Sequence, residues 1–483
     1  MEFKILGHAC LLVKTKTHSV IIDPWLLGSC YWRSWWNFPG AVFDEQELRN
    51  VDAVIISHIH WDHWHGPTLK RFFKGKHVIV PDEPSMRSRN DLRAIGFKSV
   101  EAVPHAKTVT VGNIEITLHQ FGLFLNDAAI VIQADGKTLL NANDAKIAGR
   151  SLRALLKQHG KIDFAFRSHS SANSRINHKI YDDAQNFISD DREHYLRSFC
   201  LFMDAVEPQY AIPFASNHCH LHDDTITYND YISNPLELRK YNEESNGQSA
   251  TWALKVMLPG SQWSEASGFE LASEEPFKNT AQFISKYRER VRGTLEKYRE
   301  QELAVDISSR TMVKFLEMLS VKFFFERHLP DFILKLEWPG GRTEAYEVSP
   351  ARRSVEPTAA MNQPKLGLPI LKMPAIVFRD AVRKNMFHHA GISKRCEFMA
   401  FNAVDMQALK KIFGRLEILE LNAMPLRVSY LRRFFYAYFF RWRELFVYAT
   451  AAFMIFLYRK PIYLVEEDIL IRSRMRSLGR ILR

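Results

Sequence analysis

Four potential metal ligands, His58, His60, Asp62 and His63, lie within six consecutive residues. They follow the apolar stretch 54–57, which predicts a short buried strand. Alternate residues of an extended turn project to opposite sides, so we expect His58 and His60 to face one metal ion and Asp62 and His63 a second. Imidazole and carboxylate ligands suit zinc or iron, with manganese as a further candidate. The alternative, a solvated polar loop, would rarely gather four such ligands at this spacing.

Two later segments carry more ligands at the ends of predicted strands, where sites collect in layered α/β folds. Asp144 follows one such strand, and we expect it to bridge two cations, although it would equally cap the helix that comes next. His218, His220 and His222 follow another strand. One of the three is expected to be a ligand, and His218 or His222 would complete the second metal site.

Substrate contacts are expected from residues around this cluster. Trp61 is placed to wall the site or to stack on a ring. The polar run 168–175 predicts a loop at the mouth of the pocket, where Asn173 and Arg175 could hold an anion. His8 ends a predicted strand and could line the same pocket, although a packed histidine is the plainer interpretation.

The charge balance indicates an anionic partner. A net charge of +11 and a sequence pI near 9.3 favour a phosphate-bearing small molecule, a membrane face or nucleic acid. Nucleic acid ranks last, because no known binding motif is present and the basic residues gather near the C-terminus. Five scattered cysteines without a Cys-x-x-Cys pair argue against a disulfide framework. No N-terminal signal segment is visible, so a cytoplasmic location is the default expectation.

The first half of the chain alternates predicted strands and helices, which indicates an α/β sandwich. After a Pro-Gly turn signal the pattern changes to helices at 278–303 and 310–327. The proline-rich stretch 349–372 predicts a loop or linker. We therefore predict two domains, a metal-binding domain at 1–265 and a largely helical α+β domain at 266–483.

The C-terminal region is the least typical segment. Residues 428–443 mix aromatic residues with arginines, and 445–458 are almost uninterruptedly apolar but short of the ~20 residues that a spanning helix needs. A buried core helix of the second domain is the preferred interpretation. The alternative is an interfacial helix that lies in a membrane face, helped by the basic tail 472–483, which would make the protein a peripheral membrane protein.

Several motifs occur in the order found in one superfamily. They are Gly7-His8-Ala9-Cys10, Asp23-Pro24-Trp25-Leu26-Leu27-Gly28, Trp35-Trp36, Ile56-Ser57-His58-x-His60-x-Asp62-His63, Pro67-Thr68-Leu69-Lys70 and Pro213-Phe214-Ala215. With them the chain resembles the metallo-β-lactamase superfamily and, more narrowly, the metallo-β-lactamase-like part of CMP-N-acetylneuraminate hydroxylases, up to about residue 260. The resemblance implies a metallo-β-lactamase αββα sandwich with a C-terminal α+β or helical extension.

The chain departs from this pattern in two ways. The hydroxylases carry an N-terminal Rieske iron–sulfur domain, whereas this sequence has no paired Cys-x-His and Cys-x-x-His segments, so a redox role would need electrons from a partner. The superfamily's third-motif histidine has no clean match, since Leu123 takes its place and His119 lies slightly early. The first metal would then be held by His58 and His60 alone, unless His119 or His169 joins them.

Three functions follow from these residues. As a hydrolase, which we rank first, the protein would use metal-activated water, with a pKa of about 7, against an anionic, phosphate-bearing or nucleotide-sugar-like substrate. His58 and His60 would hold the metal and Asp62 would orient the water or shuttle its proton. As an iron-dependent oxygenase, suggested by the resemblance, it would hydroxylate a nucleotide sugar or amino sugar with an external electron donor. A non-catalytic binding module is the third hypothesis.

Overall fold

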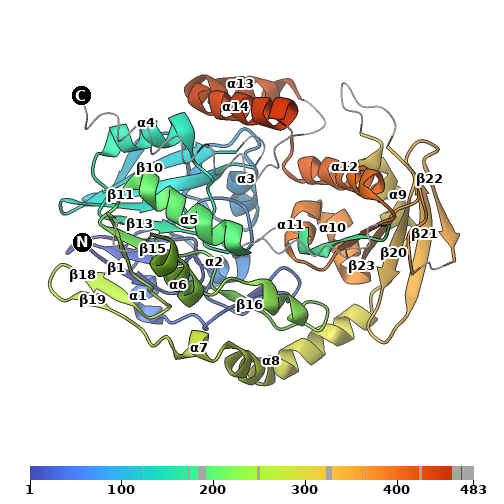
Figure 1. Cartoon of the computed structure of the whole chain (residues 1–483), viewed down its shortest axis with the longest axis horizontal. Coiled ribbons are helices and arrows are strands. Elements are labelled where there is room, and N and C mark those ends of the chain that lie inside the picture. Colours follow the sequence, from blue (N-terminus) through green and yellow to red (C-terminus); the bar gives the residue numbers. More distant parts are fainter. Residues whose placement is uncertain are drawn as a thin grey trace.

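The computed structural model describes residues 1–122, 125–170, 175–182, 192–246, 251–321, 329–359, 362–423, 427–458 and 469. A two-sheet sandwich forms the left-hand part of Figure 1, and a smaller unit built around a third sheet lies to its right. Helices α13 (Val428–Phe440) and α14 (Trp442–Tyr458) run across the top of the sandwich.

Among the described residues, the first sheet of the sandwich has eight strands. In spatial order they are β19 (Gly268–Glu270), β18 (Gln262–Ser264), β1 (Glu2–Ile5), β2 (Leu11–Lys14), β3 (Ser19–Ile22), β6 (Ala53–Ile55), β7 (His77–Pro81) and β8 (Val100–Val103). Strands β3, β6, β7 and β8 run parallel to one another. Their carboxyl ends therefore lie along the same edge of the sheet.

The second sheet is built in the same manner from seven described strands. They are β17 (Ala253–Leu254), β15 (Tyr210–Pro213), β13 (Phe164–Arg167), β12 (Lys137–Asn141), β11 (Asp127–Ala134), β10 (Ile114–Phe121) and β9 (Thr108–Val111). Strands β12, β13, β15 and β17 are parallel. The loops that leave β12, β13 and β15 thus gather at one edge of this sheet, as the loop after β6 does in the other.

Apolar side chains fill the space between the two sheets and cover their outer faces. Phe3, Ile22 and Ile55 of the first sheet meet Ile130 and Phe166 of the second in one buried cluster. The outer faces are covered by α1 (Glu45–Arg49), α2 (Gly66–Phe72) and α3 (Arg87–Ala94) on one side and by α4 (Gly149–His159), α5 (Arg192–Val206) and α6 (Pro235–Asn246) on the other. This order of layers confirms the predicted αββα sandwich.

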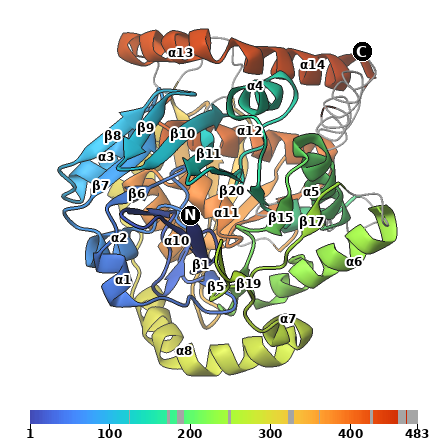
Figure 2. The same cartoon turned by 90° about the vertical axis from the view of Figure 1, so that its left-hand side faces the viewer.

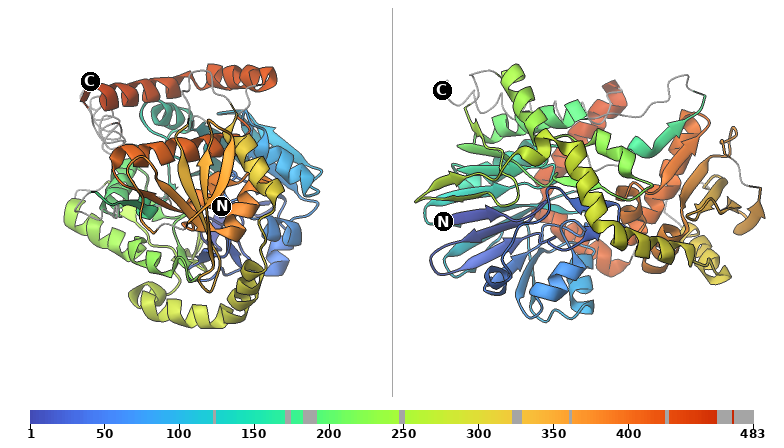
Figure 3. Two further views of the ribbon diagram at one scale, coloured as in Figure 1. Left: turned by 90° about the vertical axis from the view of Figure 1, so that its right-hand side faces the viewer. Right: turned by 90° about the horizontal axis from the view of Figure 1, so that it is seen from below.

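The third sheet belongs to the smaller unit. Its strands are β14 (His178–Ile180), β24 (Glu397–Ala400), β23 (Ile370–Pro374), β20 (Phe332–Glu337), β21 (Thr343–Ser349) and β22 (Ser354–Thr358). Its helices are α9 (Ser309–Leu319), α10 (Ala375–Lys384), α11 (Phe387–Ile392) and α12 (Ala403–Glu420). The short helix α7 (Glu275–Lys278) and the long helix α8 (Thr280–Leu303) lead from the sandwich to this unit (Figure 3).

The two units share chain segments. Strand β14 lies within the first half of the sequence, yet it pairs with β24 in the third sheet. The hairpin of β18 and β19 spans the boundary predicted at 265/266 and belongs to the first sheet. The domain boundary remains a prediction.

Two sequence expectations were wrong. The stretch 349–372, predicted as a loop, contains β22 and the start of β23. The loop prediction rested on the prolines, but Pro357 lies in the edge strand β22, where a missing backbone donor is tolerated. The apolar segment 445–458 is not a buried helix of the second domain. As α14 it packs Val447 and Met454 on the sandwich beside α4 and leaves its other side exposed (Figure 2).

Candidate metal centre

Asp23 anchors the metal-binding loop to the end of the first sheet. It follows β3 and is fully buried. Its carboxylate accepts hydrogen bonds from the Ser57 backbone and hydroxyl (2.7 and 2.6 Å) and from the Asn143 amide (2.7 Å), and it contacts His63 Nδ1 at 2.8 Å. A carboxylate on Nδ1 fixes the ring orientation and turns Nε2 of His63 toward the centre.

The first group of candidate ligands consists of His8, Asp62 and His63. Their ligand atoms lie within 4.8 Å of one another, and all three side chains are buried. Asp62 Oδ2 lies 3.2 Å from His8 Nε2 and 3.4 Å from His63 Nε2. The Tyr31 hydroxyl donates to the other oxygen, Asp62 Oδ1, so the carboxylate is held from both sides.

The second group consists of His58, His60 and Asp144, whose ligand atoms also lie within 4.8 Å of one another. His58 Nε2 is 2.8 Å from His60 Nδ1. Asp144 Oδ2 lies 3.3 Å from His63 Nε2, which belongs to the first group. Asp144 therefore stands between the two groups, the position that a bridging carboxylate needs.

The charges in this centre are arranged as metal ligands require. Burial lowers the pKa of His58 to about 3, and nearby His63 adds to the effect, so the imidazole is neutral with its lone pair free. Burial and His58 likewise hold the pKa of His60 well below its ordinary value. Burial alone would raise the pKa of Asp62, but His63 and His8 outweigh it and keep the carboxyl ionised.

Orphaned polar atoms show that the residues fit a bound cation. Within the described part of the chain, the buried Asp127 Oδ1 has no hydrogen-bond partner, and His63 Nε2 makes no hydrogen bond although carboxylate oxygens of Asp144 and Asp62 lie 3.3 and 3.4 Å from it. Buried polar groups are almost always paired, so each such atom needs an explanation. A metal ion on the shared side of the imidazoles and carboxylates would satisfy both, and the nitrogen and oxygen donors suit zinc, iron or manganese.

Sequence reasoning missed Asp127 as a candidate ligand. It opens β11, and its Oδ1 lies 4.0 Å from His58 Nε2. Burial, with the Asp144 carboxylate adding to it, raises the pKa of Asp127 to about 7. The third-motif position was assigned to Leu123, four residues earlier and outside the described residues, so Asp127 offers a carboxylate near that position and not at it. The signal was an acidic residue at the start of a predicted strand.

Helix α11 of the smaller unit also reaches the centre, which the sequence did not reveal. His388 Nε2 is 2.8 Å from His60 Nε2, and its other nitrogen lies 3.2 Å from Glu417. The neighbouring His389 contacts the Ile59 carbonyl at 3.1 Å through Nε2. The pair of consecutive histidines was the available signal, but nothing in its spacing linked it to residues more than 300 positions away.

Trp61, expected to wall the site, lies in an aromatic cluster next to it. Its ring stacks on Tyr31 at 5.8 Å and lies 4.8 Å from Trp32 and 5.0 Å from His389. Asn173 and the side chain of Arg175, the other expected substrate contacts, fall outside the described residues.

His218 and His169 lie close to the centre without joining either group. His218 stacks on Trp35 with ring centroids 3.7 Å apart, and it is 5.5 Å from the ring of His8. His169 is fully buried, and among the described residues neither of its ring nitrogens has a hydrogen-bond partner. His220 points to Ser34 within the small sheet of β16 (His218–His220), β5 (Trp35–Asn37) and β4 (Ser29–Cys30).

His119 lies away from the centre. Ile116 and Leu118 of β10 face the other sheet, so His119 projects to the opposite face by strand alternation. There its Nε2 lies 2.9 Å from Nε2 of His159 in α4, and its ring packs against His105. The structure thus gives His119 a packing role in place of the expected ligand role.

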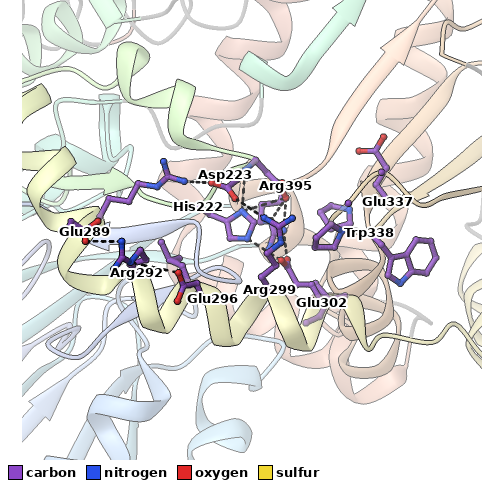
Figure 4. Close-up of a pocket in the computed structure, with 18 of the residues that line it drawn as sticks. His222, Asp223, Glu289, Arg292, Glu296, Arg299, Glu302, Glu337, Trp338 and Arg395 are labelled. Atoms are coloured by element: carbon purple, nitrogen blue, oxygen red, sulfur yellow. Dashed lines mark hydrogen bonds and ion pairs between the residues drawn. The ribbon is translucent and has the colours of Figure 1, made fainter.

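His222 belongs to another cavity, of about 1140 Å³, between α8 and the turn after β20 (Figure 4). Its Nε2 lies 3.3 Å from Glu302 and its Nδ1 3.7 Å from Asp224. The guanidinium of Arg395 pairs with both of these carboxylates at 2.5 Å. The expected contribution of His222 to the second metal site is therefore replaced by an ion-pair network with its own cation.

Comparisons with known proteins agree with the fold. Residues 2–160 match the Beta-lactamase superfamily domain. A putative Rieske 2Fe-2S iron–sulfur protein of Mycobacterium tuberculosis is 28% identical over 255 residues, 49% of this chain and 48% of that protein. The cytidine monophosphate-N-acetylneuraminic acid hydroxylase of Danio rerio is 24% identical over 267 residues, 53% and 44% of the two chains. The chain thus spans about half the length of the curated relatives that it matches.

Solved structures with a similar fold include both hydrolases and a hydroxylase. An isothiocyanate hydrolase from Delia radicum gut bacteria has a TM-score of 0.40 at 17% identity and covers 55% of this chain and 99% of its own. A diiron beta-hydroxylase from Streptomyces venezuelae has a TM-score of 0.31 at 18% identity, with 44% of each chain covered. The match of residues 2–160 to the Beta-lactamase superfamily domain confirms the expected resemblance to the metallo-β-lactamase superfamily.

Proposed function

We propose that this chain is an iron-dependent hydroxylase that acts on an anionic small molecule of the nucleotide-sugar or amino-sugar class. Its metallo-β-lactamase fold and the hydroxylases among its curated relatives support a metalloenzyme of this kind. The hydrolase, ranked first on the sequence alone, becomes the second candidate. Asp127 is the observation that changes the order.

Asp127 alters the donor set of the first metal position. With it, His58 and His60 would share their metal with two carboxylates, Asp127 and Asp144, in place of a third imidazole. Two histidines with carboxylate donors and open positions are typical of non-haem iron that reacts with dioxygen. Asp62 and His63, with His8 beside them, would hold the second ion.

The chain's own residues orient and enclose this donor set. Asp23 fixes the His63 ring and Tyr31 holds Asp62, and the loss of such supporting contacts commonly weakens metal binding 10- to 100-fold. The stacked rings of Trp61 and Tyr31 lie beside Asp62, where they would exclude water from one side of the centre. A bound iron pair would supply the activation of dioxygen. Anion binding by Arg175 and Asn173 remains part of the proposal.

The proposed reaction needs a reductant of stated class. One oxygen atom of dioxygen enters a C–H bond of the substrate and the other leaves as water, which consumes two protons and two electrons. We assign those electrons to an iron–sulfur centre outside the sequence given, which contains no Rieske ligand segments.

Metal content tests the proposal. Protein purified without oxygen and offered equal iron and zinc should retain about two irons per chain. Asp127→His should shift the retained metal toward zinc, because it restores a three-imidazole set. The matched control is Asp230→His, at an exposed position that should leave the iron-to-zinc ratio unchanged. Wild-type protein that retains zinc in preference to iron would overturn the iron assignment.

Hydrolysis remains the second candidate because of His388. Its Nε2 lies 2.8 Å from His60 Nε2, whereas His58 faces the other nitrogen of that ring, so a turn of the His60 ring would let His388 add a third imidazole from the smaller unit. Three protein nitrogens with an open position are typical of catalytic zinc. A zinc-loaded protein that cleaves phosphoesters or acyl-amino sugars, and loses this activity in His388→Phe, would support the hydrolase.

A further inference from the structure

Helices α13 and α14 present an unusual outer surface, which we term the aromatic face. Figure 2 shows the two helices almost end to end along one side of the molecule. Phe439 is 74% and Phe435 68% exposed. The face consists of Val428, Phe435, Tyr436, Phe439, Phe440, Trp442, Leu445, Phe446 and Phe453. These are most of the large exposed hydrophobic side chains of the described residues, so the face is a concentrated patch and not a normal scatter.

The exposed charged residues of the segment 427–458, beside the aromatic face, all have one sign. Arg427, Arg432 and Arg443 are exposed beside it. The only acidic residue in the sequence from 427 to 458 is Glu444, and it is buried in an ion pair with Arg441. Asp82, from the segment after β7, lies at the edge of the face and pairs with Arg433 at 3.9 Å. The exposed guanidinium groups of Arg427, Arg432 and Arg443 still give the face a positive excess, which is complementary to an apolar partner that carries negative charge.

The opposite side of the helices is firmly attached to the sandwich. Val447 and Met454 pack into the cluster under α4. Arg441 and Tyr438 donate to the Gly122 carbonyl at 2.8 and 3.0 Å, and the Gly122 amide donates to Glu444 at 2.7 Å. The orientation of the aromatic face is thus fixed by buried polar contacts.

We propose that the aromatic face lies on the surface of a lipid bilayer that contains anionic headgroups. Phe and Trp side chains would enter the boundary between headgroups and acyl chains, and the arginines would pair with lipid phosphates. Among the described helices, none has the length and apolar character needed to cross a membrane, so the helices would lie in the plane of the surface. At 1.5 Å per residue, α13 and α14 together give a stripe about 45 Å long.

A second copy of the chain fits this face less well. A two-fold interface would place the face against itself, and its exposed arginines would then oppose the exposed arginines of the second copy. A bilayer supplies the opposite charge at the required depth.

Flotation of the full chain with vesicles tests the proposal. Wild-type protein should float with phosphatidylcholine vesicles that contain about 30% phosphatidylglycerol at 0.1 M salt, and far less with phosphatidylcholine alone. The double variant F439S/F446S should bind at least tenfold more weakly, because each buried ring contributes about a tenfold factor. R432E/R443E should lose a similar factor, since each arginine contributes about fivefold at an anionic surface.

Matched variants elsewhere separate the face from general effects. L366S/V404S removes two apolar side chains that are 69% and 73% exposed, at least as much as Phe446, and should bind as the wild type does. Unchanged thermal unfolding of F439S/F446S would show that the fold is retained. Absence of flotation at low salt would overturn the proposal. It would also be overturned if F439S/F446S bound vesicles as strongly as the wild type, because another segment, such as the basic tail, would then account for the binding. If light scattering shows dimers for the wild type and for L366S/V404S but monomers for F439S/F446S, the face would be assigned to self-association instead.

Discussion

Two groups of histidines and carboxylates in this molecule look alike in composition and differ in what surrounds them. His58, His60 and Asp144 form one group, and His222, Asp224 and Glu302 form the other. In the second group a buried arginine already balances the carboxylates. In the first no lysine or arginine of the described residues pairs with the ligand atoms, and adjacent buried atoms lack partners. The residue types in both groups suggest a metal site, but the neighbouring charges decide whether a metal cation is needed to balance the buried carboxylates.

Loss of a ligand should produce the largest difference between the two groups. His58→Ala or Asp62→Ala should abolish turnover. Either variant should also lower metal affinity by more than the 10- to 100-fold loss that is typical when a supporting residue is removed. His222→Ala should leave metal content unchanged, because Arg395 and not a metal balances Glu302. Elemental analysis after dialysis measures both. Full metal content in His58→Ala, or metal loss in His222→Ala, would reverse the comparison.

Removal of Arg395 should affect stability and spare the metal. Arg395→Met leaves Glu302 buried without its cation, which typically costs about 3 to 5 kcal/mol of unfolding free energy. Denaturant unfolding monitored by circular dichroism measures this, and metal content should not change. The matched control is Arg310→Met, at an exposed position on α9. A stability equal to wild type would mean that the network is not formed.

The same network predicts a pH dependence. Burial alone would raise the pKa of Glu302, but His222 and Arg395 outweigh it and hold the pKa below its ordinary value. A carboxyl whose pKa is lower in the folded than in the unfolded protein stabilises the fold at any pH above its ordinary, unfolded pKa. This stabilisation is lost as the pH falls through the lowered pKa of the folded state. Wild type should therefore lose more unfolding free energy than Arg395→Met between pH 5 and pH 3. Parallel curves for the two proteins would contradict this.

Sequence patterns predicted the sandwich and one side of the metal centre, because these depend on local order. A strand followed by His58-x-His60-x-Asp62-His63 places its ligands within one loop, and Asp144 ends a neighbouring strand. His388 could not be predicted, since it reaches His60 only through the packing of the smaller unit on the sandwich. Spacing alone could not assign His222, whose environment is set by Arg395, 173 positions later.

A supporting residue should have a moderate effect. Asp23→Asn keeps the shape of the side chain but removes the charge that contacts His63 Nδ1 and the Ser57 hydroxyl. Metal affinity should fall about 10- to 100-fold with part of the activity retained at saturating metal. Asp52→Asn is the control, because this exposed carboxylate accepts only from Ser19 among the residues that the structure describes. Unchanged affinity in Asp23→Asn would show that the loop holds its geometry without this anchor.

The smallest effect is expected at His119, the histidine that sequence reasoning offered as a third ligand. It faces α4 and pairs with His159, so His119→Gln should change unfolding free energy by only about 1 kcal/mol, the usual worth of one hydrogen bond. Metal content should be unaffected, whereas Asp127→Asn should lower it, because Asp127 and not His119 lies beside His58. The opposite result would be metal loss in His119→Gln and full metal content in Asp127→Asn. It would mean that β10 presents its other face to the centre, so that its register against β11 differs by one residue.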